Sequence, residues 1–332
     1  MIGTSEGIDA VLSYVAEVDA DAIATLSETH CLWLAGNADR FRGTCKLMLP
    51  SLGCLEAVES KLRQIEVARE LGFDVLPTYV IRALDDVRHI VSDHYPLCLR
   101  PSMERTVEPE FKVRIVRSSN EMADFIGGIR AFGDGIVAQP VLSLPNALLH
   151  CTSGEDGELL NLKGFLVDRK FESFSLRIRP MQVPEDLIEK VAAFSRFFKF
   201  SGPYHFDFLY SPETGEWHYL EVNVRFGGTT DKVKWLGVDE PANCLMAYGL
   251  AGLRTPPKYS TKRFAVVNKL TILKHLLVTA RRGSELLDFP RESRLASAVH
   301  SLGDLFLAKD SISDFRDIRG TIASRLFSAI PH

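Results

Sequence analysis

GPYHFDFLYSPETGEWHYLEVNVRFGG, residues 202–228, contains two runs that alternate apolar and polar residues, 204–210 and 217–225. SPETGE lies between the runs, and its Pro and Gly are typical of a hairpin loop. The stretch therefore predicts two antiparallel strands joined by a short turn. The chemistry of the chain is concentrated on this hairpin.

The second strand of the hairpin has one polar face. Because side chains on a strand alternate between its two faces, Glu221, Asn223 and Arg225 project together. Arg225 is placed to reach a substrate or a transferring phosphoryl group, where a guanidinium stabilises developing charge. The residues expected to pack behind this face are Leu220, Val222 and Val224.

The register of the hairpin decides how close its two carboxylates lie. If residues 212–215 form the loop, Asp207 lies opposite Leu220 and beside Glu221, whereas a loop one residue longer places Asp207 directly opposite Glu221. Two such carboxylates repel each other unless a cation lies between them. With the amide of Asn223 they form an oxygen ligand set that suits Mg²⁺. The polar face of an ordinary hairpin is the alternative interpretation.

FDF (residues 206–208) followed by LEVNVR (residues 220–225) resembles the ATP-grasp superfamily, which includes D-alanine ligases, biotin carboxylase and carbamoyl-phosphate synthetase. That family has a hydrophobic-Asp/Glu-hydrophobic strand, a turn and a Glu-hydrophobic-Asn-x-Arg strand. The resemblance implies an α+β (α/β) fold of two lobes, with ATP bound between antiparallel sheets. It also implies that Asp207, Glu221 and Asn223 bind Mg²⁺, or Mn²⁺ in its place, and that Arg225 is the catalytic arginine.

The resemblance covers roughly residues 51–253. ESKLRQIEVARELGFDVLPTYVI, residues 59–81, is similar to a family segment in which a lysine opens a helix, which implies that Lys61 contacts the nucleotide. A solvated lysine at the start of a helix is the alternative. YPLCLRP, residues 95–101, resembles the strand that carries an ATP-binding lysine before proline. Here that position holds Arg100, which keeps the charge but binds phosphate as a fork.

GIVAQPVLSLP, residues 135–145, resembles the segment between the lobes that binds adenine through backbone groups. The resemblance implies contacts at Gln139, Val141 and Leu142, with Gln139 at a position that is usually glutamate. The glycine-rich loop that covers the phosphates in the family has no counterpart between Leu99 and Gly127. Lys112 lies in this interval and is the candidate to supply positive charge there. A lysine that protects an edge strand from aggregation is the alternative.

Three regions are predicted along the chain: a partial α/β layer at 1–58, an ATP-grasp domain at 59–253 with lobes at about 59–134 and 135–253, and a mostly helical extension at 254–332. The first region corresponds to only the last part of a domain that is complete in the family. Either a partner completes it, in a homodimer or with another chain, or the site is unusually open.

Periodicity and turn residues predict the other elements. Helices are expected at 59–71, 85–91, 120–129 (capped by Ser119 or Asn120) and 185–200, and extended segments at 75–81, 95–101, 111–117, 135–142 and 159–179. Arg169 and Lys170 in the last segment are the candidates to face the phosphates, and a solvated sheet face is the alternative interpretation of this run. Residues 227–232 are expected to form a flexible loop near the substrate.

Composition excludes several classes of protein. With 332 residues, 46% of them hydrophobic, and a formal net charge of −4, the chain is globular and has no field that favours nucleic acid or an acidic membrane. Six cysteines without paired spacing fit a reducing compartment. The N-terminal residues have no leader-like pattern and no stretch is apolar enough to span a membrane, so we expect a cytoplasmic protein.

The hairpin and its resemblance to the ATP-grasp superfamily imply a Mg²⁺- and ATP-dependent ligase that joins a small carboxylate to an amine through an acylphosphate. A phosphotransferase, or an impaired nucleotide-binding protein with a regulatory or scaffold role, is the alternative. The second alternative is suggested by Arg100, by Gln139 and by the missing glycine-rich loop.

Overall fold

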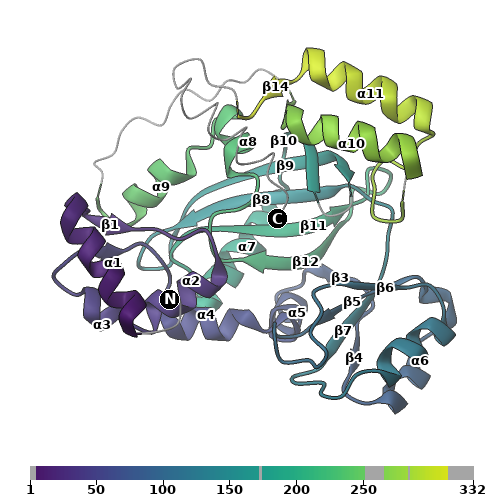
Figure 1. The fold of residues 1–332 in the computed structure, drawn as a ribbon, viewed down its shortest axis with the longest axis horizontal. Helices are drawn as coiled ribbons and strands as arrows, with labels where there is room; N and C mark the ends of the chain where they lie inside the picture. The colour runs from purple at the N-terminus through teal and green to yellow at the C-terminus, as the bar shows by residue number, and fades with distance from the viewer. Residues whose placement is uncertain (1–4, 172–173, 251–264, 283–284, 313–332) are drawn as a thin grey trace.

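The computed structural model of the protein describes residues 5–171, 174–250, 265–282 and 285–312. The described residues form an eight-stranded sheet, a four-stranded sheet and a pair of short parallel strands. The small sheet lies in a separate lobe at the lower right of Figure 1, and the N-terminal helices lie at the left. This mixed arrangement of helices and largely antiparallel sheets confirms the predicted fold class. Residues 254–264 and 313–332 of the predicted extension lie outside the described residues.

The N-terminal region is a small layer of helices around two parallel strands. Its elements are α1 (Ser5–Val18), β1 (Ala22–Ile23), α2 (Glu28–Ala35), α3 (Ala38–Phe41), β2 (Lys46–Leu47) and α4 (Leu52–Glu59). β1 pairs with β2 only, so the layer has two strands. Ile8, Leu34 and Phe41 form its core. This region brings α2 and α4 to the edge of the site described below.

The small lobe contains the four-stranded sheet, in the order β4-β7-β5-β6. Its elements are β4 (Tyr79–Ile81), η1 (Leu84–His89), η2 (Ser92–His94), β5 (Leu97–Pro101), β6 (Arg114–Val116), α6 (Ser119–Gly127) and β7 (Ile136–Pro140). Ser118 caps α6 by accepting a hydrogen bond from the Glu121 amide, so the cap lies one residue before the predicted ones. Because β7 pairs with β4 and β5, this sheet extends to Pro140, past the predicted lobe boundary at 134.

The large sheet has the order β14-β13-β10-β9-β8-β11-β12-β3. Its strands are β3 (Asp74–Val75), β8 (Asn146–Ser153), β9 (Leu159–Phe171), β10 (Phe174–Met181), β11 (Gly202–Tyr210), β12 (Trp217–Asn223), β13 (Val266–Val267) and β14 (Lys309–Asp310). β8 lies between β9 and β11 and pairs antiparallel with both. The predicted elements did not include β8, although it lies between the two longest strands of the sheet.

One face of the large sheet is covered by α5 (Lys61–Glu70) and α7 (Glu185–Phe198). Ser60 caps α5, which begins two residues after the predicted start. The rings of Phe194, Phe206, Phe208 and Tyr219 pack together between α7 and the hairpin strands. Buried aromatic pairs of this kind contribute stability beyond the area that they bury. The predicted apolar back of the hairpin is therefore the main core of the protein.

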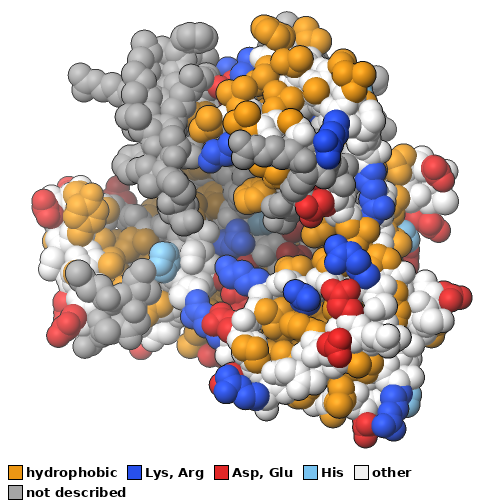
Figure 2. Space-filling view, turned by 45° about the vertical axis from the view of Figure 1, so that its right-hand side comes forward, with side chains coloured by type: hydrophobic (Ala, Val, Ile, Leu, Met, Phe, Trp, Pro, Cys, Tyr) orange, Lys and Arg blue, Asp and Glu red, His pale blue; other side chains and the backbone are white. Residues whose placement is uncertain are grey.

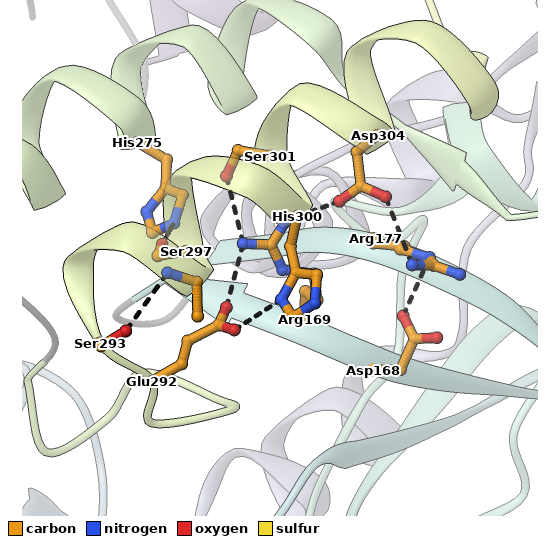
Figure 3. Close-up of polar contacts among 11 residues, drawn as sticks. Asp168, Arg169, Arg177, His275, Glu292, Ser293, Ser297, His300, Ser301 and Asp304 are labelled. Carbon is orange, nitrogen blue, oxygen red and sulfur yellow. Dashed lines mark hydrogen bonds and ion pairs between the residues drawn. The ribbon is translucent and has the colours of Figure 1, made fainter.

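The other face of the large sheet carries α8 (Thr230–Trp235), α9 (Glu240–Ala247), α10 (Lys269–Arg282) and α11 (Arg294–Leu307). Figure 3 shows Arg169 of β9 reaching toward α11, where it donates to Asp304 Oδ2 (2.6 Å) and to Ser301 Oγ (3.1 Å). Glu292 Oε1 lies 3.4 Å from the same guanidinium. Arg169 therefore joins β9 to α11. The expectation that it faces the phosphates is wrong.

Two further properties concern membrane-spanning helices and cysteines. Within the described residues, no helix is long and apolar enough to cross a membrane. All six cysteines are free thiols, and four of them are buried.

Candidate active site

The β11–β12 hairpin contains a bulge that decides the position of its carboxylates. Near the turn, Tyr210 pairs with Trp217 and Phe208 with Tyr219, which is the register of the shorter loop. Beyond Phe208 the register shifts, and Asp207 pairs directly with Glu221. Each of the two predicted registers therefore holds along one part of the hairpin.

Leu220 is the extra residue of this bulge. It was expected behind the polar face, but it lines the same cavity as Glu221. The bulge turns both side chains to one side, as bulges re-aim side chains elsewhere. Val222 and Val224 are buried as predicted, in the core behind the hairpin.

The two paired carboxylates repel each other, and their environment shifts both pKa values. Burial raises the pKa of Asp207 to about 8, and the negative charge of Glu221 adds to the rise. Burial also opposes ionisation of Glu221, but Arg100 and Lys61 hold its pKa below the ordinary value. Asn223 Nδ2 donates to Asp207 Oδ2 at 3.2 Å, and the Asn223 side chain is also hydrogen bonded to Glu221, so the three predicted metal ligands are in contact. A cation between the carboxylates would relieve their repulsion.

Arg100 connects the two lobes at this point. Its guanidinium donates to Glu221 Oε2 (3.0 Å) across the cleft and to Gln139 Oε1 (2.8 Å) on the neighbouring strand. Gln139 Nε2 in turn donates to Thr78 Oγ1 at 3.1 Å. Arg100 and Gln139, two of the three departures from the family pattern, thus contact each other directly.

Lys61 is held at the start of α5 by the small lobe. Its backbone amide donates to the Ser102 carbonyl at 2.8 Å, and the Ser60 and Ser102 hydroxyls lie 3.1 Å apart. One helical turn inward, Gln64 accepts from the Val222 amide (3.0 Å) and donates to the Val222 carbonyl (3.2 Å). α5 is therefore fixed to both lobes, and it places Lys61 beside Glu221.

The predicted adenine-binding segment runs out of β7. The Val141 amide donates to the Pro96 carbonyl at 2.8 Å, so that amide is already used within the lobe. Among the described residues, no acceptor is hydrogen bonded to the Leu142 amide. Both residues line the cleft beside Gln139. Leu142 is thus the better candidate to donate a backbone hydrogen bond to a ligand.

Two lysines approach the cleft from opposite lobes. Lys112 lies in the segment between β5 and β6, and Lys170 lies on β9. Burial lowers the pKa of Lys170 to about 8, and its Nζ donates to Asn146 Oδ1 at 2.8 Å. Because side chains alternate along a strand, Lys170 faces the cleft while its neighbour Arg169 faces α11.

All ten predicted site residues line one cavity of about 750 Å³ between the lobes. They are Lys61, Arg100, Lys112, Gln139, Val141, Leu142, Asp207, Glu221, Asn223 and Arg225. Figure 2 shows a hollow between the small lobe and the helices above it, with Lys and Arg side chains around it. The structure brings these residues together, while the role of each in binding stays a prediction.

Sequence reasoning missed Glu28, which comes to the cavity from α2. Its Oε1 lies 3.4 Å from Arg225 Nε, so it orients the predicted catalytic arginine. Burial raises the pKa of Glu28, and the charge of Arg225 opposes this rise. No local pattern around Glu28 signals this contact, because it depends on how the N-terminal region packs against β12.

The segment after Arg225 is more ordered than expected. Residues 230–235 form α8, and Thr229 and Lys232 are buried. His150 Nε2 lies 2.9 Å from Thr229 Oγ1, and its Nδ1 lies 2.7 Å from Glu240 Oε1. The expectation of a flexible loop at 227–232 is wrong, because a buried His–Glu pair beneath it holds the segment in place.

The donor set at the hairpin fits Mg²⁺. Within the described residues, no group of three or more His, Cys, Asp or Glu side chains could hold a metal by itself. Mg²⁺, however, commonly binds one or two carboxylates together with waters and nucleotide phosphates. Asp207 and Glu221 form such a pair, at the wall of a cavity that also holds five cationic side chains: Lys61, Arg100, Lys112, Lys170 and Arg225.

Comparison with known proteins identifies the fold. No family model matches the chain, and no curated protein matches it. The chain is similar to the biotin carboxylase domain of Hydrogenobacter thermophilus 2-oxoglutarate carboxylase, solved with MgADP, ADP and bicarbonate: TM-score 0.56, 16% identity, 79% of this chain and 60% of that chain. It is also similar to Campylobacter jejuni biotin carboxylase, solved as a β-γ-ATP complex. The TM-score is 0.56 at 16% identity, and the match covers 74% of this chain and 58% of that chain.

A third similar structure is an L-amino acid ligase from Bacillus licheniformis, with a TM-score of 0.50, 18% identity, and coverage of 67% of this chain and 53% of that chain. The chain spans less than two thirds of the length of each of these three proteins. At these identities the likeness shows a shared fold.

Proposed function

This chain has the ATP-grasp fold, and on that premise we propose that it is an ATP- and Mg²⁺-dependent enzyme that joins a small carboxylate to an amine. The observation that supports this most is the direct pairing of Asp207 with Glu221 inside a cavity with five cationic side chains. A carboxylate pair at such a position is costly unless it binds a cation. The cations of the same wall suit a polyanion such as ATP.

Each part of the cavity has a role in this proposal. Lys61, Arg100, Lys112 and Lys170 bind phosphate oxygens, and the 139–142 segment holds the adenine. Bound at Asp207, Glu221 and Asn223, Mg²⁺ would neutralise charge on the phosphates. Arg225, oriented by Glu28, stabilises charge on the phosphoryl group as it transfers.

The reaction has two steps. An oxygen of the substrate carboxylate forms a bond to the γ-phosphorus while the bond from that phosphorus to ADP breaks, which gives an acylphosphate. The amine nitrogen then bonds to the carbonyl carbon, and phosphate leaves with the electron pair of the broken C–O bond. The proton lost by the nitrogen passes to solvent or to a nearby carboxylate. The chain needs to supply positioning and charge, and no side-chain nucleophile.

Hydroxylamine tests this function because it intercepts an acylphosphate. With Mg²⁺·ATP and a panel of small carboxylic acids, we expect one class of acid to give an acyl hydroxamate with equal amounts of ADP and phosphate. Arg225→Ala should lower this rate on the order of a hundredfold or more. Arg114→Ala, in an exposed ion pair with Glu121, is the matched control and should retain the rate.

Two outcomes would overturn the proposal. Formation of ADP with a stable phosphorylated product and no hydroxamate would identify a phosphotransferase. Binding of ATP without ADP formation for any acid would identify a nucleotide-binding module without ligase activity.

A further inference from the structure

A second cavity of about 240 Å³ adjoins the nucleotide cavity. The two cavities share five lining residues: Glu28, Lys61, Glu104, Glu221 and Asn223. The smaller one therefore opens beside the predicted metal ligands, at the end of the nucleotide cavity where Arg225 lies. A molecule in it would be next to the reacting groups.

The walls of this cavity come from the N-terminal region. Glu28 and Leu32 lie one turn apart on α2, and Leu55 and Val58 lie on one face of α4. Val224, just after β12, closes the floor. Leu55, Val58 and Val224 are buried, with 3% to 6% of their surface exposed, so the inner end of the cavity is hydrocarbon.

The charges of the two cavities differ. The lining of the small cavity contains four carboxylates, Glu28, Glu59, Glu104 and Glu221, against two cations, Lys61 and Arg105. The lining of the nucleotide cavity contains five carboxylates and five cations. Two of these carboxylates, Glu28 and Glu221, also have cationic partners just outside the lining, Arg225 and Arg100. The small cavity thus presents both signs of charge, which suits a ligand that carries an ammonium group as well as a carboxylate.

Arg105 adds one localised positive charge at the same place. Its Nη2 donates to Oγ1 of Thr29, the residue that follows Glu28 in the chain, at 3.1 Å. Among the described residues, no carboxylate lies within ion-pair distance of Arg105. A guanidinium of this kind is available to bind a carboxylate as a fork.

We propose that this cavity binds the amine substrate, and that the substrate is an α-amino acid with a small apolar side chain. The ammonium group contacts Glu28, the carboxylate contacts Arg105, and the side chain packs against Leu32, Leu55 and Val58. A cavity of about 240 Å³ has room for one amino acid. This inference rests on the proposed ligase function, because it names the acceptor of that reaction.

Four probes separate the features of this ligand. L-leucine carries all three groups, 3-methylbutylamine lacks the carboxylate, 4-methylpentanoate lacks the amine, and L-asparagine has a polar side chain of similar shape. Calorimetric titration with Mg²⁺ and a non-hydrolysable ATP analogue should show L-leucine binding about tenfold or more tighter than each of the others. Equal affinity for all four probes, or none for L-leucine, would overturn the inference.

Variants assign each contact. Glu28→Gln should weaken L-leucine about tenfold and leave 4-methylpentanoate unchanged, whereas Arg105→Gln should weaken L-leucine similarly and leave 3-methylbutylamine unchanged. Leu32→Phe fills the cavity and should abolish L-leucine binding while ATP still binds, and Leu52→Phe, at a position outside the cavity lining, is its control. A Leu32→Phe variant that binds L-leucine normally would place the amino acid elsewhere.

The titrations also separate this inference from the proposed function. If ATP binds and no amino acid does, the acceptor assignment fails while the nucleotide site stands. If ATP itself does not bind, the proposed function fails, and the acceptor assignment fails with it.

Discussion

Arg100 shows how two departures from a family pattern can compensate for each other. The resemblance expects lysine at this position and glutamate at the position of Gln139. A guanidinium can donate to two acceptors in fixed directions, which an ammonium does less well. Arg100 therefore contacts both Gln139 and Glu221, and the neutral Gln139 leaves its charge to act on Glu221. These two residues, read singly, suggested an impaired site, but their contact favours a functional one.

Lys170 should make the affinity for ATP depend on pH, and its lowered pKa fixes the direction of the change. Burial lowers its pKa to about 8, so the free protein loses this charge as the pH rises through that value. Bound phosphates favour the charged form, and ATP affinity should therefore fall above about pH 8, by up to about tenfold at pH 9. The measurement is the dissociation constant of ATP from pH 7 to pH 9.

Lys170→Arg is the matched variant for this titration, because arginine stays charged over the whole range. Other groups in the cavity also titrate, but they are common to both proteins, so the difference between the two pH profiles isolates Lys170. If the two profiles have the same slope, Lys170 does not contact the phosphates.

At the scale of elements, the sequence predicted the hairpin and most strands of both lobes but missed β8. The strand NALLHCTS is buried on both faces from Ala147 to Ser153 and so lacks the alternation that marks an exposed strand. The bulge at Leu220 was also beyond prediction, because the alternation 217–225 is compatible with either register. Most of the site residues were found because they lie on or next to these strands, and Lys61 because it opens a predicted helix. Glu28, in contrast, belongs to the separate N-terminal region.

α11 turns its apolar side chains outward, opposite to the orientation that its apolar periodicity predicts. Leu295, Val299 and Phe306 are 58% to 82% exposed, whereas Ser301 and Asp304 face the large sheet. Periodicity alone would place the apolar stripe inward. The buried guanidinium of Arg169 needs a carboxylate, and this requirement turns the polar side of α11 toward β9.

Asp304→Ala tests this arrangement. Removing Asp304 leaves the buried guanidinium of Arg169 with only the more distant carboxylate of Glu292, so the free energy of unfolding should fall by about 3 kcal/mol. ATP affinity should not change, because Arg169 does not line the nucleotide cavity. Urea unfolding and ATP titration of the same preparation measure both quantities. If the variant is as stable as the wild-type protein but binds ATP more weakly, Arg169 contacts the phosphates.

At the scale of the whole molecule, three segments meet at Glu221. The small lobe contributes Arg100, α5 contributes Lys61 and the N-terminal region contributes Glu28, while the large sheet provides Glu221 itself. The division into regions at 58 and 253 stays a prediction, and so does the partner that would complete the first region. Because these segments meet, one cavity contains all ten predicted residues, although the chain spans less than two thirds of the length of its structural neighbours.

The central claim is that the Asp207–Glu221 pair binds Mg²⁺ together with ATP, and the dissociation constant of ATP with and without Mg²⁺ tests it most directly. Wild-type protein should bind ATP on the order of tenfold or more tighter with Mg²⁺, and Glu221→Gln should lose this gain. Glu213→Gln, the same change at the exposed turn of the same hairpin, should keep it. The claim is contradicted if Glu221→Gln keeps the full Mg²⁺ effect, or if the wild-type protein binds ATP equally well without the metal.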